Sequence, residues 1–451
     1  MVNSRELYVN TKPGKLFFRV AIPGAISMFA TMIYFVFEGM FVGQGLGDTA
    51  FAAVNLAMPF VIVNFSLADL IGVGSSVPIS IHLGRGEEDE ANNYFTSSIV
   101  MIFFTACFIG ALLYFGAAPL MSFMGADGEL KRLSVQYLQV YALCAPLTTM
   151  TFAVDNYLRI CGKVKTSMIL NVVMSLVTIA LDYLFIFVLG LGVWAAALAA
   201  CGAMISCTAV AMMPFFLGKL QLKFTKPKIS FHLIKQVVTS GSPVFLSNIA
   251  GRIASIVMNI ALLSLGGEAA VTIFGVMMYG GDLLQPLIYG ICDSLQPAIG
   301  YNYGAKEHKR VKSIEKWVLA AGATVSFIFV GLMMLIPQNI AGIFLQKEET
   351  ELILASARVI RIYSLTFLTR WFAFAIQSLF VALDRPVPAT VLSILNALVF
   401  PVILIAALWG LGLDGLWLNA PLTSLLVAIV AGVLLFTLRK HLLDSSKRDV
   451  E

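Results

Sequence analysis

The residues most able to do chemistry in this chain are ionisable side chains that interrupt long apolar stretches. Glu38, Asp69, Asp155 and Asp182 lie in such stretches in the first half, and Arg159 follows Asp155 by four residues. An Asp at the centre of a bilayer costs roughly 2.5–3.5 kcal/mol on insertion scales, so such a residue is by default a functional candidate. Buried carboxylates can bind and release a proton or a small cation. The pattern therefore indicates ion coupling.

Glu38 and Asp182 are expected at matching depths. At 1.5 Å per residue, Glu38 lies roughly 9 Å and Asp182 roughly 10 Å from the outer end of its helix. Two acids at one level can share a cation or a proton, because repulsion disfavours ionising both. We therefore expect them to face one polar chamber. The alternative is that each acid hydrogen-bonds a neighbouring Ser, Thr or Tyr and merely packs.

The other buried charges have simpler interpretations. Asp155 and Arg159 are spaced to meet on one helix face, so we expect an internal ion pair, with ion coupling as the alternative role for Asp155. Asp69 lies nearer mid-membrane and joins the candidate coupling acids. In the second half, unpaired charges at mid-depth would be costly, so a polar cluster is expected there. Its candidate members are Arg252, Asp282, Asp293 and Arg370.

The elements that position these residues are predicted membrane helices. The chain has 451 residues, of which 59% are hydrophobic and only 12% charged, and its mean hydropathy is +0.89. Nearly all of its apolar stretches exceed the roughly 20 residues that cross a bilayer as a helix. An all-α membrane protein of twelve spans is predicted. The stretches are 16–44, 50–83, 93–118, 131–161, 167–189, 193–217, 236–265, 269–301, 313–337, 351–383, 387–410 and 414–438.

Basic residues predict the orientation of these helices. One set of helix ends carries most of the Lys and Arg, whereas the opposite ends carry only Lys131, Arg132 and Lys347. Cytoplasmic loops are enriched in basic residues, so both termini of this plasma-membrane protein are expected in the cytoplasm. The net charge of +5 is thus an orientation signal, and no nucleic-acid partner is expected.

Other chemistries lack their sequence signals. The six Cys lie within apolar helices without a CxxC pair, and the four His are scattered, so neither a metal site nor redox chemistry is expected. Residues 72–76 (Gly-Val-Gly-Ser-Ser) lack the Lys of a phosphate-binding loop and indicate close helix packing. We expect no enzymatic activity and no cofactor other than a coupling ion, H⁺ or Na⁺.

The chain also repeats itself at a spacing of about 220 residues. Such duplication is typical of transporters whose site lies at the repeat interface. We predict an N-terminal lobe over 1–217, a basic linker over 218–235, and a C-terminal lobe over 236–451, with the symmetry axis along the membrane normal. The related positions are Pro23 and Pro243, Gly47-Asp48 and Gly267-Glu268, Gly190-Leu191-Gly192 and Gly410-Leu411-Gly412, and Tyr141 and Tyr363.

Several motifs resemble those of the MATE (multidrug and toxic compound extrusion) family, in particular its bacterial MepA-like branch. The resemblance covers essentially the whole chain. It rests on Gln296-Pro297 followed by Tyr301-Asn302-Tyr303-Gly304-Ala305, on Gly84-Arg85-Gly86, on Arg159-Ile160-Cys161-Gly162, and on Leu181-Asp182-Tyr183-Leu184-Phe185-Ile186-Phe187.

The resemblance implies two six-helix lobes around a V-shaped cavity, and exchange of H⁺ or Na⁺ for amphipathic, often cationic, compounds. It places Glu38 and Asp182 at the family's acidic positions and makes Pro23 the residue at which the first helix bends. Two positions depart from the family pattern: Glu38 replaces the commoner Asp, and Thr178 stands where Asn is common. Gly251-Arg252 falls where some members carry a second-lobe acid, so sodium coordination is not expected there.

Flexible Met and aromatic side chains suit poorly specified hydrophobic ligands. We expect small amphipathic substrates, contacts with membrane lipids and a monomeric protein. Candidate cavity residues, from their positions alone, are Phe35, Phe41, Met58, Met277, Met278 and Tyr279.

Three alternative functions remain open from the sequence. A lipid-linked precursor flippase of the same superfamily would need a basic cavity, which the second-half arginines allow and the acidic first half disfavours. A dedicated exporter of one metabolite cannot be separated from a drug exporter by sequence. A major facilitator shares the twelve helices, but residues 82–86 lack that family's loop motif.

Overall fold

The computed structural model describes residues 4–282, 285–345 and 350–443, and its described residues form helices without a β-strand. This confirms the all-α membrane class predicted from composition. The elements are η1 (Glu6–Asn10), α1 (Pro13–Leu46), α2 (Asp48–Arg85), α3 (Glu88–Phe123), α4 (Gly128–Thr148), α5 (Met150–Ile160), α6 (Val164–Tyr183), η2 (Leu184–Val188), α7 (Val193–Phe216), α8 (Phe231–Asp282), α9 (Gln285–Gly304), α10 (His308–Leu335), α11 (Pro337–Phe344), α12 (Thr350–Ser364), α13 (Phe367–Ala382), α14 (Pro386–Ile394), η3 (Leu395–Val399), α15 (Phe400–Ala407), η4 (Trp409–Leu411) and α16 (Gly412–Leu443).

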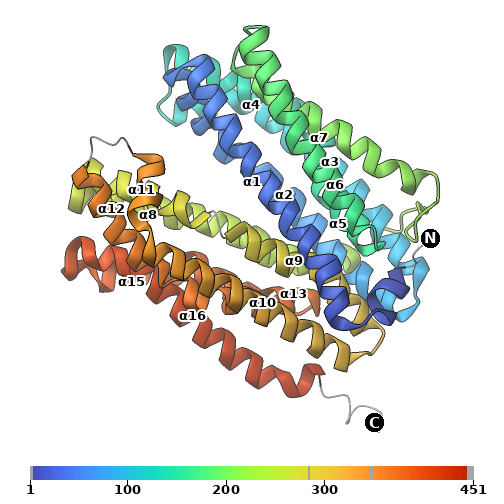
Figure 1. Cartoon of the computed structure of the whole chain (residues 1–451). Coiled ribbons are helices and arrows are strands. Elements are labelled where there is room, and N and C mark those ends of the chain that lie inside the picture. Colours follow the sequence, from blue (N-terminus) through green and yellow to red (C-terminus); the bar gives the residue numbers. More distant parts are fainter. Residues whose placement is uncertain (1–3, 283–284, 346–349, 444–451) are drawn as a thin grey trace. The chain divides into compact units, whose positions relative to one another are not determined.

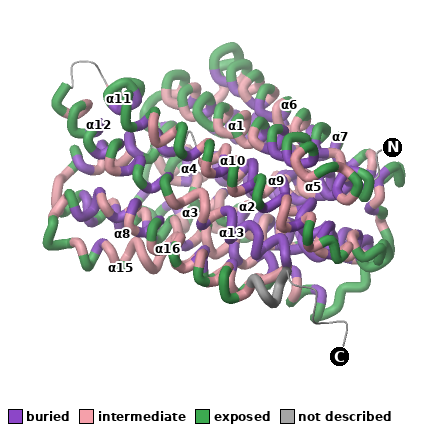
Figure 2. The backbone as a smooth tube through the Cα atoms, turned by 60° about the horizontal axis from the view of Figure 1, so that its bottom comes forward, coloured by how far each residue is buried: buried purple, intermediate pink, exposed green. Residues whose placement is uncertain are grey.

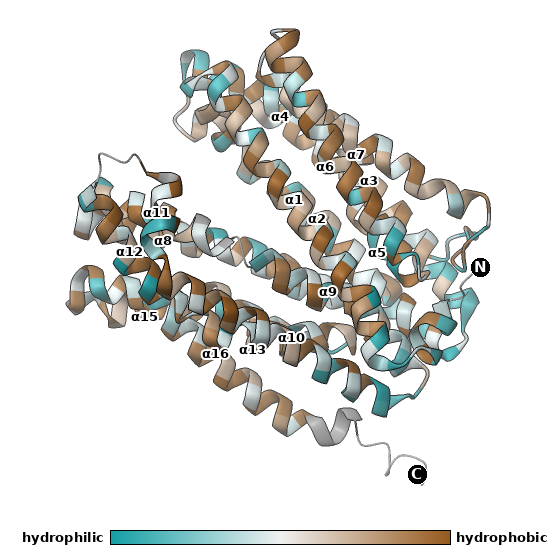
Figure 3. Ribbon diagram, viewed as in Figure 1, coloured by the Kyte–Doolittle hydropathy of each residue, from teal (hydrophilic) through white to brown (hydrophobic). Residues whose placement is uncertain are grey.

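The helices match the predicted membrane spans. Among the described residues, ten helices are long and apolar enough to cross a membrane, or eleven if α12 and α13, bent by 46°, form one span. One of the ten, α8, is itself two helices divided at Gly267, where the backbone leaves the helical region. The predicted stretches 236–265 and 269–301 meet at this break, and the count of twelve spans stays a prediction. Figure 3 shows hydrophobic residues along the helices and many hydrophilic residues toward their ends.

The chain divides into two compact units, called here the first and second unit. The first comprises Met1–Thr11 and Ile26–Gly241, and the second Lys12–Ala25 and Ser242–Glu451. One division point lies before α1, and the other two lie within α1, near Pro23, and within α8, near Pro243. Figure 1 labels both helices. The start of α1 thus belongs to the second unit, and the predicted linker 218–235 lies within the first.

Close helix contacts explain this exchange of helix ends. In the second unit, a Cβ added at Gly24 would lie 2.5 Å from the carbonyl oxygen of Gly290, so the start of α1 packs tightly on α9. In the first unit, a Cβ at Gly74 would lie 2.0 Å from the carbonyl oxygen of Val237, at the start of α8. Small residues allow such approach between membrane helices. Gly74 belongs to the 72–76 motif, whose predicted role in packing is confirmed.

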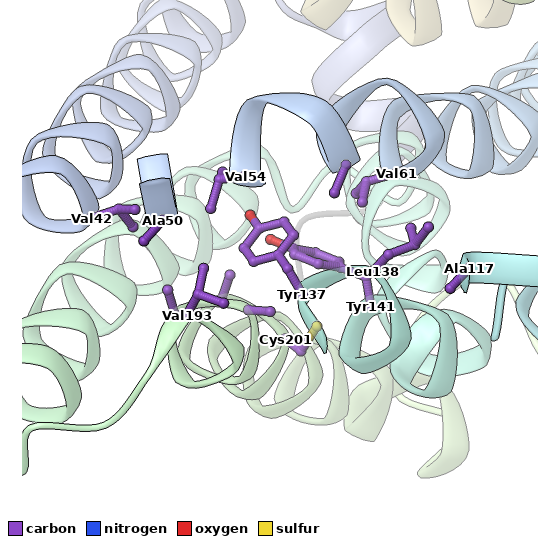
Figure 4. Packing of buried hydrophobic residues seen from close by; sticks show 14 of the residues in the cluster. Val42, Ala50, Val54, Val61, Ala117, Tyr137, Leu138, Tyr141, Val193 and Cys201 are labelled. Carbon is purple, nitrogen blue, oxygen red and sulfur yellow. The ribbon is translucent and has the colours of Figure 1, made fainter. Parts of the chain in front are cut away.

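An apolar cluster organises the first unit. It joins the end of α1 to α2, α3, α4, η2 and α7, with Val42, Val54 and Ala117 among its buried members. Figure 4 shows Tyr137 and Tyr141 of α4 within this cluster, and their ring centroids are 5.2 Å apart. In the second unit, α13 packs against α9, α10, α14 and α16. Figure 2 shows burial alternating with exposure along the helices, as expected where one face packs and the other meets lipid.

The repeat is visible in the backbone of the turns. Gly47, between α1 and α2, has φ of 85°, and its repeat-related partner Gly267 has φ of 63°. Gly86, after α2, has φ of 81°, and 220 residues later Lys306 has φ of 60°. This left-handed region is disfavoured for side chains other than glycine. The two halves therefore keep one turn conformation even where the residue type has changed.

Candidate functional site

Glu38 lies on α1 in the interior of the first unit. Its side chain is almost completely buried, and the residue is 3% exposed. The hydroxyl of Tyr137, on α4, donates a hydrogen bond of 3.1 Å to Oε1 of Glu38. Within the described chain, Oε2 has no hydrogen-bond partner. Glu38 is therefore a buried carboxyl with half of its hydrogen-bonding capacity unused.

Asp182 is more isolated than Glu38. It lies near the end of α6, it is 1% exposed, and neither carboxyl oxygen has a hydrogen-bond partner among the described residues. The helix continues as the π-helix η2 two residues later, a distortion that often marks functional sites. A buried ionised carboxylate without a partner is strongly disfavoured. This site therefore fits a proton or a bound cation on Asp182.

Glu38 and Asp182 lie close enough for their charges to interact, and both also interact with the phenol of Tyr34. The structure thus brings the two predicted acids together within one unit, beside tyrosines from α1 and α4. Thr178 lies one helical turn before Asp182, but its hydroxyl donates to the Met174 carbonyl at 2.9 Å. In the described chain the Thr178 hydroxyl therefore donates to a backbone carbonyl of its own helix and not to Asp182.

Asp155 forms the internal ion pair predicted from its spacing to Arg159. The guanidinium of Arg159 donates to Asp155, and its Nε donates to the Ser167 hydroxyl at 3.1 Å. Asn171 donates a further hydrogen bond of 3.0 Å to Asp155. This network ties α5 to α6 and gives the Asp155 carboxylate several partners, and a coupling role for Asp155 stays a prediction. Asp69 is half-buried on α2.

The second unit contains a cavity of about 400 Å³. Arg252 of α8 and Arg370 of α13 both line it, as the predicted clustering of these residues requires. The side chain of Asp282 lies outside the described residues, so its pairing with them stays a prediction. Asp293, on α9, is not among the described lining residues and instead accepts a hydrogen bond of 2.9 Å from Gln296.

The predicted substrate-cavity residues fall into two groups. Met277 and Met278 line the second-unit cavity, and the side chain of Tyr279 lies outside the described residues. In the first unit, Phe41 packs on Phe187 with centroids 5.5 Å apart. Phe41 and Met58 border the apolar cluster, whereas Phe35 is 48% exposed.

The structure also reveals polar residues that the sequence did not single out. Tyr34 precedes Glu38 by four residues, so helical spacing could have found it. Tyr137 is 99 residues from Glu38, and no local pattern indicates that contact. Glu315 of α10 is 8% exposed, and both of its carboxyl oxygens are unpartnered among the described residues. Glu315 was not among the residues considered from the sequence.

Comparison with known proteins assigns the chain to a family. The model of the MatE family matches the chain twice, over residues 23–184 and 243–406. The chain belongs to the MatE family. Both matches begin at the repeat-related prolines, which agrees with the duplication, and the predicted resemblance is confirmed. The chain is therefore a multi-pass membrane transporter and not an enzyme.

Individual relatives are distant but match over nearly the full length. The Multidrug export protein MepA of Staphylococcus aureus is 25% identical over 447 residues, which cover 96% of each chain. A MATE chain solved in complex with MaL6 superposes with a TM-score of 0.91 at 23% identity, over 98% of this chain and 100% of that one. A MOP superfamily transporter from Pyrococcus furiosus, for which reverse polarity of the binding pocket suggests a different function, has a TM-score of 0.91 at 24% identity, over 99% of each chain.

Proposed function

We propose that this transporter is a secondary antiporter of the plasma membrane that exports amphipathic, often cationic, organic compounds in exchange for protons. The family assignment and the similarity to MepA, a multidrug export protein, support export of such compounds. Glu38 and Asp182 are the proposed coupling pair. The distribution of Lys and Arg supports a cytoplasmic location for both termini.

The burial of Asp182 without a partner is the observation that carries this proposal. Within the described chain neither Asp182 nor Glu38 forms an ion pair, although the two interact with each other. Asp155 is satisfied differently, since it receives bonds from Arg159, Ser167 and Asn171. A carboxyl pair left unsatisfied is available to take up an ion and release it.

The surroundings favour a proton over sodium as that ion. A proton needs a single acceptor atom, whereas a bound metal cation needs several oxygen ligands. The Thr178 hydroxyl donates its hydrogen to the Met174 carbonyl of its own helix, and Tyr137 donates a hydrogen bond to Glu38. Two carboxyls and nearby phenols therefore suit proton exchange best.

Movement between two access states is proposed to use α1. Pro23 lies inside this helix, next to the boundary between the two compact units. Proline removes a helix hydrogen bond and favours bending at that place. Protonation of the Glu38–Asp182 pair would favour one of two conformations, to the extent that the proton binds that conformation more tightly.

Transport in proteoliposomes tests the proposal. An imposed pH gradient in sodium-free buffer is expected to drive export of a cationic dye, and Glu38→Gln and Asp182→Asn are each expected to reduce it to the level of empty vesicles. Glu129→Gln is the matched control, because Glu129 is an exposed acid that pairs with Arg132. Membrane insertion of each variant is checked first. Full transport by both variants would refute the coupling pair, and strict sodium dependence of the wild type would refute proton coupling.

A lipid-linked precursor flippase is the second candidate, favoured by the two arginines that line the second-unit cavity. The buried acids of the first unit have no evident use in that function. Flipping of a fluorescent lipid-linked pyrophosphate, without dye export, would support this alternative.

A further inference from the structure

The second-unit cavity is lined by side chains of seven elements: α8, α9, α12, α13, η3, α15 and α16. Its volume of about 400 Å³ lies within the range of roughly 300–1,000 Å³ typical of small-molecule sites. All of its lining residues belong to one compact unit, so the cavity is defined without reference to the other unit. The cavity is large enough for a small ligand or for part of a larger one.

The charge on the cavity wall is positive among its described residues. Arg252 and Arg370 line it, and the described lining contains no Asp or Glu. Arg252 is exposed and forms no ion pair with another described residue. An arginine within an apolar bundle is expensive to maintain, so one that faces a cavity is a candidate ligand partner. Arginine matches the geometry of carboxylate and phosphate groups.

Neutral hydrogen-bond donors accompany this charge. Asn248 lies one helical turn before Arg252 on α8, and Asn396 contributes an amide from η3. Thr366, between α12 and α13, is 2% exposed, and its hydroxyl has no hydrogen-bond partner among the described residues. A buried hydroxyl without a partner is costly, so a hydrogen bond to a ligand at this wall would offset that cost. Donors from three parts of the fold thus line the same cavity as Arg252.

The remainder of the wall is apolar. Met258 lies roughly 9 Å beyond Arg252 along α8, at 1.5 Å per residue. Phe274 and Met277, from the part of α8 after Gly267, also line the cavity. Methionine adapts to ligands of varied shape. A molecule with an anionic group at one end and an apolar body at the other would satisfy both parts of this wall.

We propose that this cavity binds the anionic group, a carboxylate or a phosphate, of an amphipathic ligand. Arg252 supplies the opposing charge, Asn248, Asn396 and Thr366 donate hydrogen bonds, and Met258 and Met277 contact the apolar body. If the ligand is exported cargo, the proposal rests on the proposed function. It then extends the substrate class from cations to amphipathic anions and zwitterions. An anionic lipid headgroup is the other source of the same chemistry.

Binding to the detergent-purified full chain tests the site. The probes are a dansyl-labelled long-chain carboxylic acid and a dansyl-labelled amine of equal chain length. Arg252→Gln is expected to weaken binding of the acid about tenfold or more, because a charge-assisted hydrogen bond is lost, and to leave the amine unaffected or bound more tightly. Arg252→Lys retains the charge and is expected to lose less.

Two further variants keep the test decisive. Arg358→Gln is the matched control, because Arg358 pairs with Asp414 and is absent from the described cavity wall. Thr366→Val removes only the unpartnered hydroxyl and is expected to weaken acid binding a few-fold. If Arg252→Gln does not insert, Arg252→Lys and Asn248→Ala supply the comparison. Acid binding that none of the cavity variants changes would overturn the proposal.

Experiments in membranes distinguish whether the bound anion is exported cargo or a lipid headgroup. If it is cargo, phosphatidylcholine vesicles containing the wild type exchange the dansyl acid, and Arg252→Gln does not. If the anion belongs to a lipid, phosphatidylglycerol added to nanodiscs competes with the dansyl acid for the site. This competition is lost in Arg252→Gln. Failure of the antiport proposal is distinguishable, since acid binding would then persist without pH-driven export. The cargo and the lipid interpretation both place the anion in the same cavity. Acid binding that does not depend on Arg252 would contradict both of them.

Discussion

The first and second units share a repeated backbone but carry opposite charges on related helices. At the spacing that relates Pro23 to Pro243, Glu38 of the first unit corresponds to Met258 of the second, and Arg252 corresponds to Met32. Gly47 and Gly267 meanwhile keep the same left-handed turn. Duplication therefore preserved the turn at this helix boundary, while the interior side chains of the two units diverged in charge.

The two interiors also differ in how tightly they are filled. In the first unit, Glu38 and Asp182 are buried beside the apolar cluster that contains Tyr137 and Tyr141. In the second unit, the corresponding helix lines a cavity of about 400 Å³ with Arg252 and Met258. A tight acidic site suits a proton, and a larger cationic one suits an organic ligand. The comparison teaches that coupling and anion binding can be assigned to different halves of one duplicated scaffold.

The largest expected effect is a separation of the two functions by mutation. Asp182→Asn is expected to reduce pH-driven dye export to background and to leave binding of the dansyl acid intact. Arg252→Gln is expected to weaken binding of the dansyl acid about tenfold and to reduce dye export much less than Asp182→Asn does, because each variant removes a charge from only one unit. Export and binding are measured on the same preparations. If either variant abolishes both activities while folded, the division between the units does not hold.

A structural acid should behave differently from a coupling acid. Arg159→Gln is expected to lower the free energy of unfolding by about 3 kcal/mol, because it leaves Asp155 without its charge partner in a largely buried site. Denaturation in detergent measures the loss, and adding Asp155→Asn should recover part of it. Equal stability of Arg159→Gln and the wild type would show that this pair contributes little to packing.

The repeated turns allow a smaller test. Lys306→Gly is expected to stabilise the chain by about 0.5 kcal/mol, because glycine accepts the left-handed backbone of this position without strain. The reciprocal change Gly86→Ala, at the related turn, is expected to cost about 1 kcal/mol. The sign of the two changes in unfolding free energy is the measurement. Destabilisation by Lys306→Gly would mean that the lysine side chain contributes more than its backbone costs.

Little effect is expected at Glu315, a buried acid of the second unit. Glu315→Gln keeps the shape of a side chain that has no hydrogen-bond partner among the described residues, so unfolding should change by less than about 1 kcal/mol. Export driven by a pH gradient should also be unchanged, because the proposed coupling pair lies in the first unit. Loss of export with normal folding would place a coupling acid in both units and break the comparison.

Much of the fold was predictable from the sequence because membrane helices are specified locally. Apolar length gave the spans, and the recurrence of Pro23 as Pro243 indicated the duplication that the family match supports. Asp155 and Arg159 were paired correctly, since partners four residues apart on a helix depend on its periodicity alone. The matched depths of Glu38 and Asp182, which rest on helix rise alone, stay a prediction.

The tertiary structure decided which buried groups have partners, because those contacts join helices that are distant in sequence. Tyr137 reaches Glu38 from another helix, whereas nothing described reaches the oxygens of Asp182. The cavity around Arg252 needs side chains from seven elements, so no local pattern could delimit it. The sequence by itself determined the helices, their duplication and the presence of intramembrane charges. Only the packing of helices determined which charges are satisfied and which remain available to bind an ion or a ligand.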